Sequence, residues 1–410
     1  MGEVFQGKNG TEYTTLDPAL GFGGEGIIYG LEGMPNRVAK VYKEEKRFPR
    51  QEQKLIAMIA SPLTSDAMNQ ISWPIDVIYK NSKFMGFIMP RINIGEDLNV
   101  LYDYNGKYKN VILSTRIVIA RNLCAAINSV HNAGQVCGDL NPNNIKVNLT
   151  TGIVSLVDTD SYHITDKSNK VYRCEVGLPP YLPREIQEKF KNGENLQNAY
   201  LPTYTRETDR FALAVHIFQL LMNGCFPFAT AVVSNEESIS QINTQQSVPN
   251  PQPSDNILSG NSPFFRNIPG LTIPLYAPPL TALPKEMQDL FKKAFVDGHY
   301  NPSERPTEVE WYKELSNMKQ YLKRCNVNYN HEYADHLTNC PWCDIEKKIM
   351  DLNGNNTKLN PVTSVQSSQQ ETHTNGQTNK DDAQNGNKDS KGILFKFRQL
   401  LIKLVNKDKG

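Results

Sequence analysis

The sequence has no long apolar run and almost no charge imbalance. No stretch reaches the ~18 consecutive apolar residues of a membrane-spanning helix, and residues 1–15 lack the charged-then-apolar pattern of a secretory signal. The 44 basic and 43 acidic residues leave a net charge of +1, which argues against a strongly basic nucleic-acid-binding protein. We therefore expect a cytoplasmic protein that does not bind nucleic acid.

Cysteine is also scarce, and its placement is uneven. Four of the seven cysteines stand alone, which favours reduced thiols over a disulfide framework. Cys325, Cys340 and Cys343 lie close together, and a C-x-x-C pair with a cysteine and a histidine upstream has the ligands of a Cys₃His zinc site. The spacing favours His331 as the fourth ligand, with His336 still open. Reduced surface thiols are the alternative interpretation.

The pattern changes along the 410 residues, which are enough for more than one domain. Residues 11–90 alternate short β-type runs with glycine and proline around one helical stretch at 51–60. Helical periodicity dominates from 91 to 323, most clearly at 114–133. Within this part, residues 234–261 are rich in Ser, Asn, Gln and Pro, which predicts a long surface insertion.

Three segments follow the helical part. Residues 324–350 hold the Cys/His module, and residues 351–391 are so poor in apolar side chains that they predict a disordered linker. Residues 392–410 regain apolar and basic side chains at helical spacing. Such a segment can bind a membrane surface or a partner groove, or can dock back on the folded domain.

A glycine-rich segment and a lysine suggest phosphate binding. Residues 21–26 (GFGGEG) fit G-x-G-x-x-G, in which bare backbone N–H groups can approach phosphates closely. The following residues are β-like rather than helical, which favours a hairpin over a nucleotide to a Rossmann turn. Lys40 lies in the next apolar strand, where an inward lysine needs an anion such as phosphate. An outward-facing strand lysine is the alternative.

A loop and the strand after it supply the remaining chemistry. The loop carries Asp139 and, five residues later, Asn144, and the strand at 153–157 ends in Asp158. These residues offer a base for a hydroxyl and oxygen ligands for Mg²⁺, which is what phosphoryl transfer requires.

The order and spacing of these elements resemble the eukaryotic-like bacterial Ser/Thr protein kinase family. The likeness continues in three later segments. Residues 177–185 are similar to the family segment that ends in A-P-E, and residues 209–214 are similar to the start of the helix that follows it. Residues 305–307 are similar to the late R-P-T motif. The resemblance implies an α+β bilobal fold, with a small β-rich N-lobe at 11–90 and a mainly helical C-lobe at 91–323.

The resemblance also implies ATP and Mg²⁺ as cofactors and a role for each matched residue. Asp139 is expected to be the base, and Asn144 and Asp158 the magnesium ligands. Glu52 is the expected helix partner of Lys40, with Glu44 and Glu45 also open. The expected catalytic residues are Lys40, Asp139, Asn144 and Asp158, and the expected nucleotide-binding residues are Gly21, Gly23, Gly24, Gly26, Ile28, Lys40, Glu52, Met89 and Arg91.

Scaffold roles follow from the same resemblance. Glu185 and Arg305 are expected to form an ion pair that holds the substrate-binding segment, and Asp209 is expected to brace the catalytic loop. The C-P-W-C module adds a likeness to bacterial kinases that accompany phosphatases and von Willebrand A-domain proteins. It implies protein substrates and such proteins as partners.

Four positions depart from the family pattern. Gly138 replaces the arginine before the catalytic aspartate, so activation by loop phosphorylation is not required. Thr159 replaces the phenylalanine of D-F-G, and Asn141 and Leu178 replace a lysine and a threonine, which leaves the acceptor open. An active Ser/Thr kinase and a pseudokinase scaffold are both consistent with the sequence. A small-molecule kinase is a third interpretation, for which no acceptor pocket is evident.

Overall fold

The computed structural model describes residues 2–92, 95–232 and 253–356. Most of the predicted linker and all of segment 392–410 lie outside the described residues. Residues 351–356 of that predicted linker are helical, because they continue helix α11 (Pro341–Asn356).

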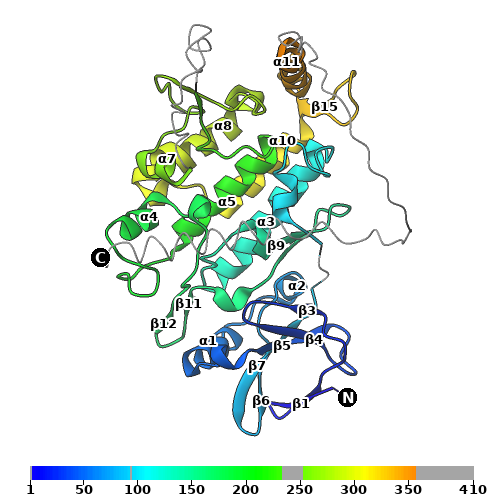
Figure 1. Ribbon diagram of the computed structural model, residues 1–410, viewed down its shortest axis with the longest axis vertical. Coiled ribbons are helices and arrows are strands. Elements are labelled where there is room, and N and C mark those ends of the chain that lie inside the picture. The colour runs from blue at the N-terminus through cyan, green and yellow to red at the C-terminus, as the bar shows by residue number, and fades with distance from the viewer. Residues whose placement is uncertain (1, 93–94, 233–252, 357–410) are drawn as a thin grey trace, which may run out of the picture. The chain divides into compact units, whose positions relative to one another are not determined.

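A seven-stranded antiparallel sheet forms the N-lobe, drawn in blue in Figure 1. Its strand order is β2-β1-β6-β7-β5-β4-β3. Helix α1 (Pro49–Ile59) begins with a proline whose fixed φ suits a first turn, and it buries Leu55 and Met58 completely. The strands are β1 (Val4–Gly7), β2 (Glu12–Thr14), β3 (Gly21–Phe22), β4 (Gly26–Gly30), β5 (Arg37–Tyr42), β6 (Asp76–Lys80) and β7 (Lys83–Pro90).

Helices build the C-lobe around a large apolar core, with a smaller separate apolar cluster beside it. Helix α3 (Leu113–Asn132) packs against α5 (Arg206–Leu221) and α10 (Glu308–Gln320), and Figure 1 shows the three side by side. Helix α5 is buried along almost its whole length. The α+β bilobal fold expected from the sequence is confirmed. The other helices are α2 (Ser65–Met68), α4 (Arg184–Lys191), α7 (Pro253–Ser259), α8 (Lys285–Lys292) and α9 (Gly298–Tyr300).

Part of the predicted surface insertion is structured. Helix α7 places Ile257 fully inside the C-lobe core, so the polar composition around it concealed a buried anchor. Residues 233–252 lie outside the described residues.

Short strands between the helices position the site. Strands β9 (Ile145–Val147) and β10 (Val154–Leu156) pair antiparallel, so the loop before β9 and the turn after β10 meet at one end of the hairpin. Asp139 and Asn144 precede β9 and Asp158 follows β10, which brings them together. The remaining strands are β8 (Glu96–Asp97), β11 (Ile164–Thr165), β12 (Val171–Tyr172), β13 (Ala231–Val232), β14 (Leu271–Thr272), β15 (Leu322–Arg324) and β16 (Glu332–Ala334).

Across the described ranges, every helix is either too short or too polar to cross a lipid bilayer.

Candidate active site

Lys40 points inward from β5 and is 7% exposed. Its Nζ lies 2.7 Å from Asp158 Oδ1 and 2.8 Å from both carboxylate oxygens of Asp160. Burial on its own would lower the pKa of Lys40, but the two carboxylates raise it above the ordinary value of a lysine. The strand lysine is therefore a buried cation held by anions of the C-lobe.

Glu52 does not reach Lys40. The Tyr79 hydroxyl donates to Glu52 Oε1 at 2.6 Å, which places this carboxylate over β6. The residue before it on α1, Gln51, faces the lysine site and donates to the Tyr42 hydroxyl at 2.9 Å. Consecutive residues of a helix point about 100° apart, so the side chain at position 52 cannot lie on the face of α1 that position 51 presents to the lysine site. The expected Glu52–Lys40 pair is absent from the structure.

The glycine-rich segment forms the hairpin expected from its sequence. Strands β3 and β4 pair antiparallel, Ile28 lies opposite Lys40 on β5, and the Gly23 N–H donates to the Gly26 carbonyl at 2.8 Å to close the tip. A Cβ at Gly26 would lie 2.5 Å from the Val41 carbonyl, so this close approach of β4 to β5 requires glycine. Gly21 and Gly24 border open space.

The hairpin tip also carries a carboxylate that the motif did not predict. Oxygens of Glu25, Asp158 and Asp160 all lie within 4.8 Å of one another. Glu25 was missed because its position in G-x-G-x-x-G is a variable one. Met89 and Arg91, two of the expected nucleotide-binding residues, lie in and just after the end of β7. Met89 pairs with Val38, and the Arg91 N–H donates to the Asn36 carbonyl at 2.9 Å.

Asp139 is 8% exposed, and two asparagines of its own loop hold its carboxylate. Asn141 Nδ2 donates to Asp139 Oδ2 at 2.7 Å, and Asn144 Nδ2 donates to the same oxygen at 3.4 Å. Burial favours the neutral acid and raises the pKa of Asp139 to about 6, against the opposing effect of the Asn141 hydrogen bond. A carboxylate with this pKa is ionised at neutral pH and can accept a proton.

The Asp158 backbone is left-handed, with φ of +58°, at the turn that follows β10. Its side chain is 44% exposed, and Oδ1 alone contacts Lys40. Thr159 is fully buried and donates to the Ser72 carbonyl at 2.7 Å, which fixes the turn to the N-lobe loop before β6. The threonine thus replaces an expected aromatic contact with a hydrogen bond.

The sequence model of one family, described as the protein kinase domain, matches residues 15–321. The chain belongs to the protein kinase family. It is 29% identical over 344 residues to protein kinase YegI of Escherichia coli K12 and 28% identical over 347 residues to protein kinase YegI of Escherichia coli O157:H7. The alignments cover 82% of this chain and 49% and 50% of the relatives, so the chain spans about half their length.

A buried carboxylate and an ion pair brace the catalytic loop and the substrate-binding segment of this kinase fold. Asp209 is fully buried and accepts from the backbone N–H groups of Cys137 at 2.7 Å and Gly138 at 2.9 Å. Arg305, with no exposed side-chain surface, donates to both oxygens of Glu185, at 2.7 and 2.9 Å. Both arrangements are those implied by the resemblance.

The activation segment of the kinase, which follows β12, packs against the catalytic loop at Gly138. At Gly138, where the family has arginine, φ is +82° and a Cβ would lie 2.8 Å from Cys174 Cβ and 2.9 Å from its Sγ. Cys174 therefore fills the space around position 138. The next residue, Glu175, forms an ion pair with Arg50 of α1, which ties the segment to the N-lobe.

The Cys/His module of the kinase brings together four of its metal-binding candidates. Cys325 Sγ lies 3.6 Å from Cys343 Sγ, and His331 Nδ1 lies 3.6 Å from Cys340 Sγ and 3.5 Å from Cys343 Sγ. A tetrahedron with Zn–S of ~2.3 Å and Zn–N of ~2.0–2.1 Å places its ligand atoms about 3.4–3.8 Å apart. His336 lies apart and contacts the Thr281 carbonyl.

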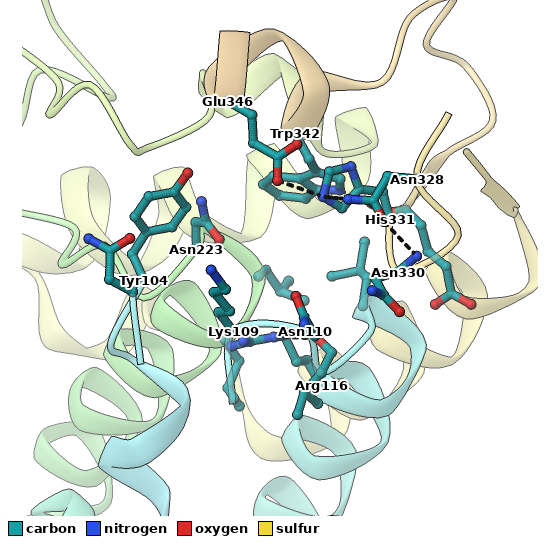
Figure 2. A pocket seen from close by; sticks show the side chains of 16 residues that line it. Tyr104, Lys109, Asn110, Arg116, Asn223, Asn328, Asn330, His331, Trp342 and Glu346 are labelled. Atoms are coloured by element: carbon teal, nitrogen blue, oxygen red, sulfur yellow. Dashed lines mark hydrogen bonds and ion pairs between the residues drawn. The ribbon is translucent and has the colours of Figure 1, made fainter. Parts of the chain in front are cut away.

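A polar cavity of about 410 Å³ separates this module from the C-lobe helices. Figure 2 shows His331 at the edge of this cavity. The Nε2 atom of His331 lies 3.3 Å from Glu346 Oε1 and 3.2 Å from Asn328 Nδ2. A carboxylate behind a histidine orients the ring toward a metal on its other nitrogen.

Proposed function

We propose that the chain is an ATP- and Mg²⁺-dependent protein kinase that transfers the γ-phosphate to serine or threonine hydroxyls. The observation that carries the proposal is the convergence of Lys40, Asp139, Asn144 and Asp158 from three segments on one site, on a chain of the protein kinase family. Each of the four has the chemical type that phosphoryl transfer needs.

The donor atoms fit a magnesium ion. Asn144 uses its amide nitrogen on Asp139, which leaves its oxygen available to a cation, and Asp158 keeps one carboxylate oxygen free of Lys40. Mg²⁺ prefers such oxygen ligands and, when bound, neutralises phosphate charge. Lys40 supplies a further positive charge to the phosphates, and the backbone of the glycine hairpin covers them.

Asp139 acts as the base in this proposal. The acceptor hydroxyl donates its proton to the Asp139 carboxylate, which Asn141 and Asn144 orient by their hydrogen bonds. Asn141 stands where the family has a lysine, and it contacts the same carboxylate. The Leu178 backbone also hydrogen bonds to Asp139, so the segment that presents an acceptor stays attached to the base despite the loss of the threonine.

Metal-dependent nucleotide binding separates an enzyme from a scaffold. The proposal predicts that ATP raises the melting temperature only with Mg²⁺ and that Asp158→Ala abolishes the shift. Transfer from labelled ATP to a generic acceptor, followed by mass spectrometry, should place phosphate on serine or threonine. Binding without transfer to any acceptor would favour the pseudokinase scaffold, and phosphate on other residues would reject the stated specificity.

We further propose a structural zinc ion held by Cys325, His331, Cys340 and Cys343. The ligand spacing and the Glu346 carboxylate behind His331 support this assignment. A phosphatase or von Willebrand A-domain partner, a membrane or partner contact of 392–410, and a cytoplasmic location remain predictions.

A further inference from the structure

Asp160 is a buried carboxylate in the active site to which no role in the reaction has been given. It lies in the turn Thr159–Ser161, two residues after Asp158, and is 2% exposed. Both of its oxygens lie 2.8 Å from Lys40 Nζ, and one of them also accepts from the Tyr42 hydroxyl at 2.5 Å. A buried charge of this kind persists only when it is paired and hydrogen bonded.

The exposures of Asp158 and Asp160 assign them different roles. Asp158 is 44% exposed and uses one oxygen on Lys40, so its other oxygen can face a metal. Asp160 has both oxygens occupied by Lys40 and Tyr42 and almost no open surface. The exposed carboxylate is therefore suited to a cation from solution, and the buried one is suited to holding the lysine.

Helix α1 offers no competing carboxylate. Glu52 is bound to Tyr79 over β6, and the residue that faces the cluster, Gln51, is neutral. Gln51 donates to the Tyr42 hydroxyl at 2.9 Å and lies 3.4 Å from the Asp160 carbonyl. Helix α1 thus contacts the cluster through the Gln51 amide, and its buried Lys54 adds a positive charge near Asp160 but no carboxylate for Lys40.

The turn that carries Asp160 is rigidly attached. Thr159 is bound to the Ser72 carbonyl at 2.7 Å, and the Ser161 hydroxyl donates to the Asp158 carbonyl at 2.8 Å. The position of Asp160 is therefore set by the same turn that sets Asp158.

We propose that Asp160 is the positioning residue that holds Lys40 against the nucleotide phosphates in place of a helix glutamate. This inference rests on the proposed kinase function. It gives Lys40 a carboxylate partner without one from α1, and it frees Asp158 for the metal because Lys40 keeps a second carboxylate.

The test compares three variants of the full chain with the wild type. Asp160→Asn keeps the shape and removes the charge, and it should weaken Mg²⁺–ATP binding and lower kcat/KM about a hundredfold through misplacement of Lys40. Glu52→Gln, the matched control on α1, should bind ATP and turn over as the wild type does. Asp160→Asn combined with Gln51→Glu returns a negative charge next to Tyr42 and should recover a large part of the loss.

Two results would overturn the inference. One is that Asp160→Asn binds ATP and turns over as the wild type does, or that Glu52→Gln loses as much ATP affinity and turnover as Asp160→Asn. The other is a loss in Asp160→Asn that excess Mg²⁺ restores and Gln51→Glu does not, which would make Asp160 a metal ligand. ATP affinity is measured separately from turnover, so a wild-type protein that binds ATP without transferring phosphate defeats only the proposed function. Absence of nucleotide binding in the wild type defeats both.

Discussion

Burial and one asparagine set the proton affinity of Asp139, the proposed base. Its carboxylate is nearly covered, and Asn141 donates to it at 2.7 Å. Burial penalises the charged form and raises the pKa to about 6, whereas the Asn141 hydrogen bond stabilises the charged form and works against that rise. Only the ionised carboxylate can accept the proton of an acceptor hydroxyl.

The rate of phosphate transfer should therefore fall as the pH is lowered. We expect kcat to be constant at neutral pH and to fall tenfold per pH unit below about 6, as Asp139 becomes protonated. Removal of the hydrogen bond in Asn141→Ala should move this acid limb to higher pH. The measurement is a pH–rate profile at saturating ATP.

Asn143 provides the control for that profile. It lies in the same loop but contacts Asn99 rather than Asp139. Asn143→Ala should leave the acid limb where it is in the wild type, and an equal displacement in both variants would show that general loosening of the loop, not the hydrogen bond, sets the pKa of Asp139.

At the scale of elements, the catalytic loop and the activation segment are fitted to each other at Gly138 and Cys174. A Cβ at 138 would overlap Cys174, and the left-handed φ of +82° adds strain to any other residue. The ion pair of Glu175 with Arg50 continues the connection to α1. These contacts tie the segment to the catalytic loop and to α1.

Gly138→Ala should consequently destabilise the protein by steric overlap as well as by backbone strain. The control is Gly134→Ala, at a φ of +78° with nothing within 4 Å of the added Cβ, where only the backbone penalty of about 1–2 kcal/mol applies. Overlap with Cys174 should add roughly 1–3 kcal/mol. Thermal unfolding should show a clearly larger fall in melting temperature for Gly138→Ala, and equal falls would refute the fit between loop and segment.

At the scale of the whole molecule, the Cys/His module is joined to the C-lobe through a helix end. The Glu332 side chain accepts from the Ser114 N–H at 2.8 Å, which satisfies a free backbone donor at the start of α3. Trp342 in turn donates to the Glu332 carbonyl at 2.7 Å. Organisation of the module by a metal should thus stabilise the C-lobe.

We expect one equivalent of zinc per chain and a lower melting temperature after its removal by a chelator. Metal analysis and thermal unfolding of the same sample check both. Cys340→Ser should lose the zinc, whereas Cys225→Ser, a buried cysteine outside the cluster, should retain it. Zinc retained in Cys340→Ser, or an unchanged melting temperature without metal, would contradict this role.

The sequence predicted those features that depend on order along the chain. Most N-lobe strands, helix α3 and the spacing of Asp139, Asn144 and Asp158 follow from local patterns and loop lengths, and the fold brings the three residues together as expected. Strand β1 lies before the predicted lobe at 11–90 and was not predicted. The pair of Glu185 with Arg305 followed from the family resemblance and could not have come from spacing alone.

The partner of Lys40 could not be predicted, because it depends on the rotation of α1 against the sheet. Burial of Leu55 and Met58 sets that rotation, and one residue of helix phase decides whether position 51 or 52 faces the lysine. In the sequence, Asp160 is recognisable only as a second acidic residue close to Asp158, the expected magnesium ligand. Nothing in the local pattern of residues indicates that its side chain turns inward.

The most direct test of the central claim is the initial rate of phosphate transfer from ATP at neutral pH with saturating Mg²⁺ and ATP, for the wild type and Asp139→Asn. Asparagine keeps the shape and cannot accept the proton. The account predicts transfer by the wild type and a rate about 10²–10⁴-fold lower in Asp139→Asn, with ATP affinity retained. Equal rates would contradict the account, because they would show that the rate of phosphate transfer does not depend on the Asp139 carboxylate.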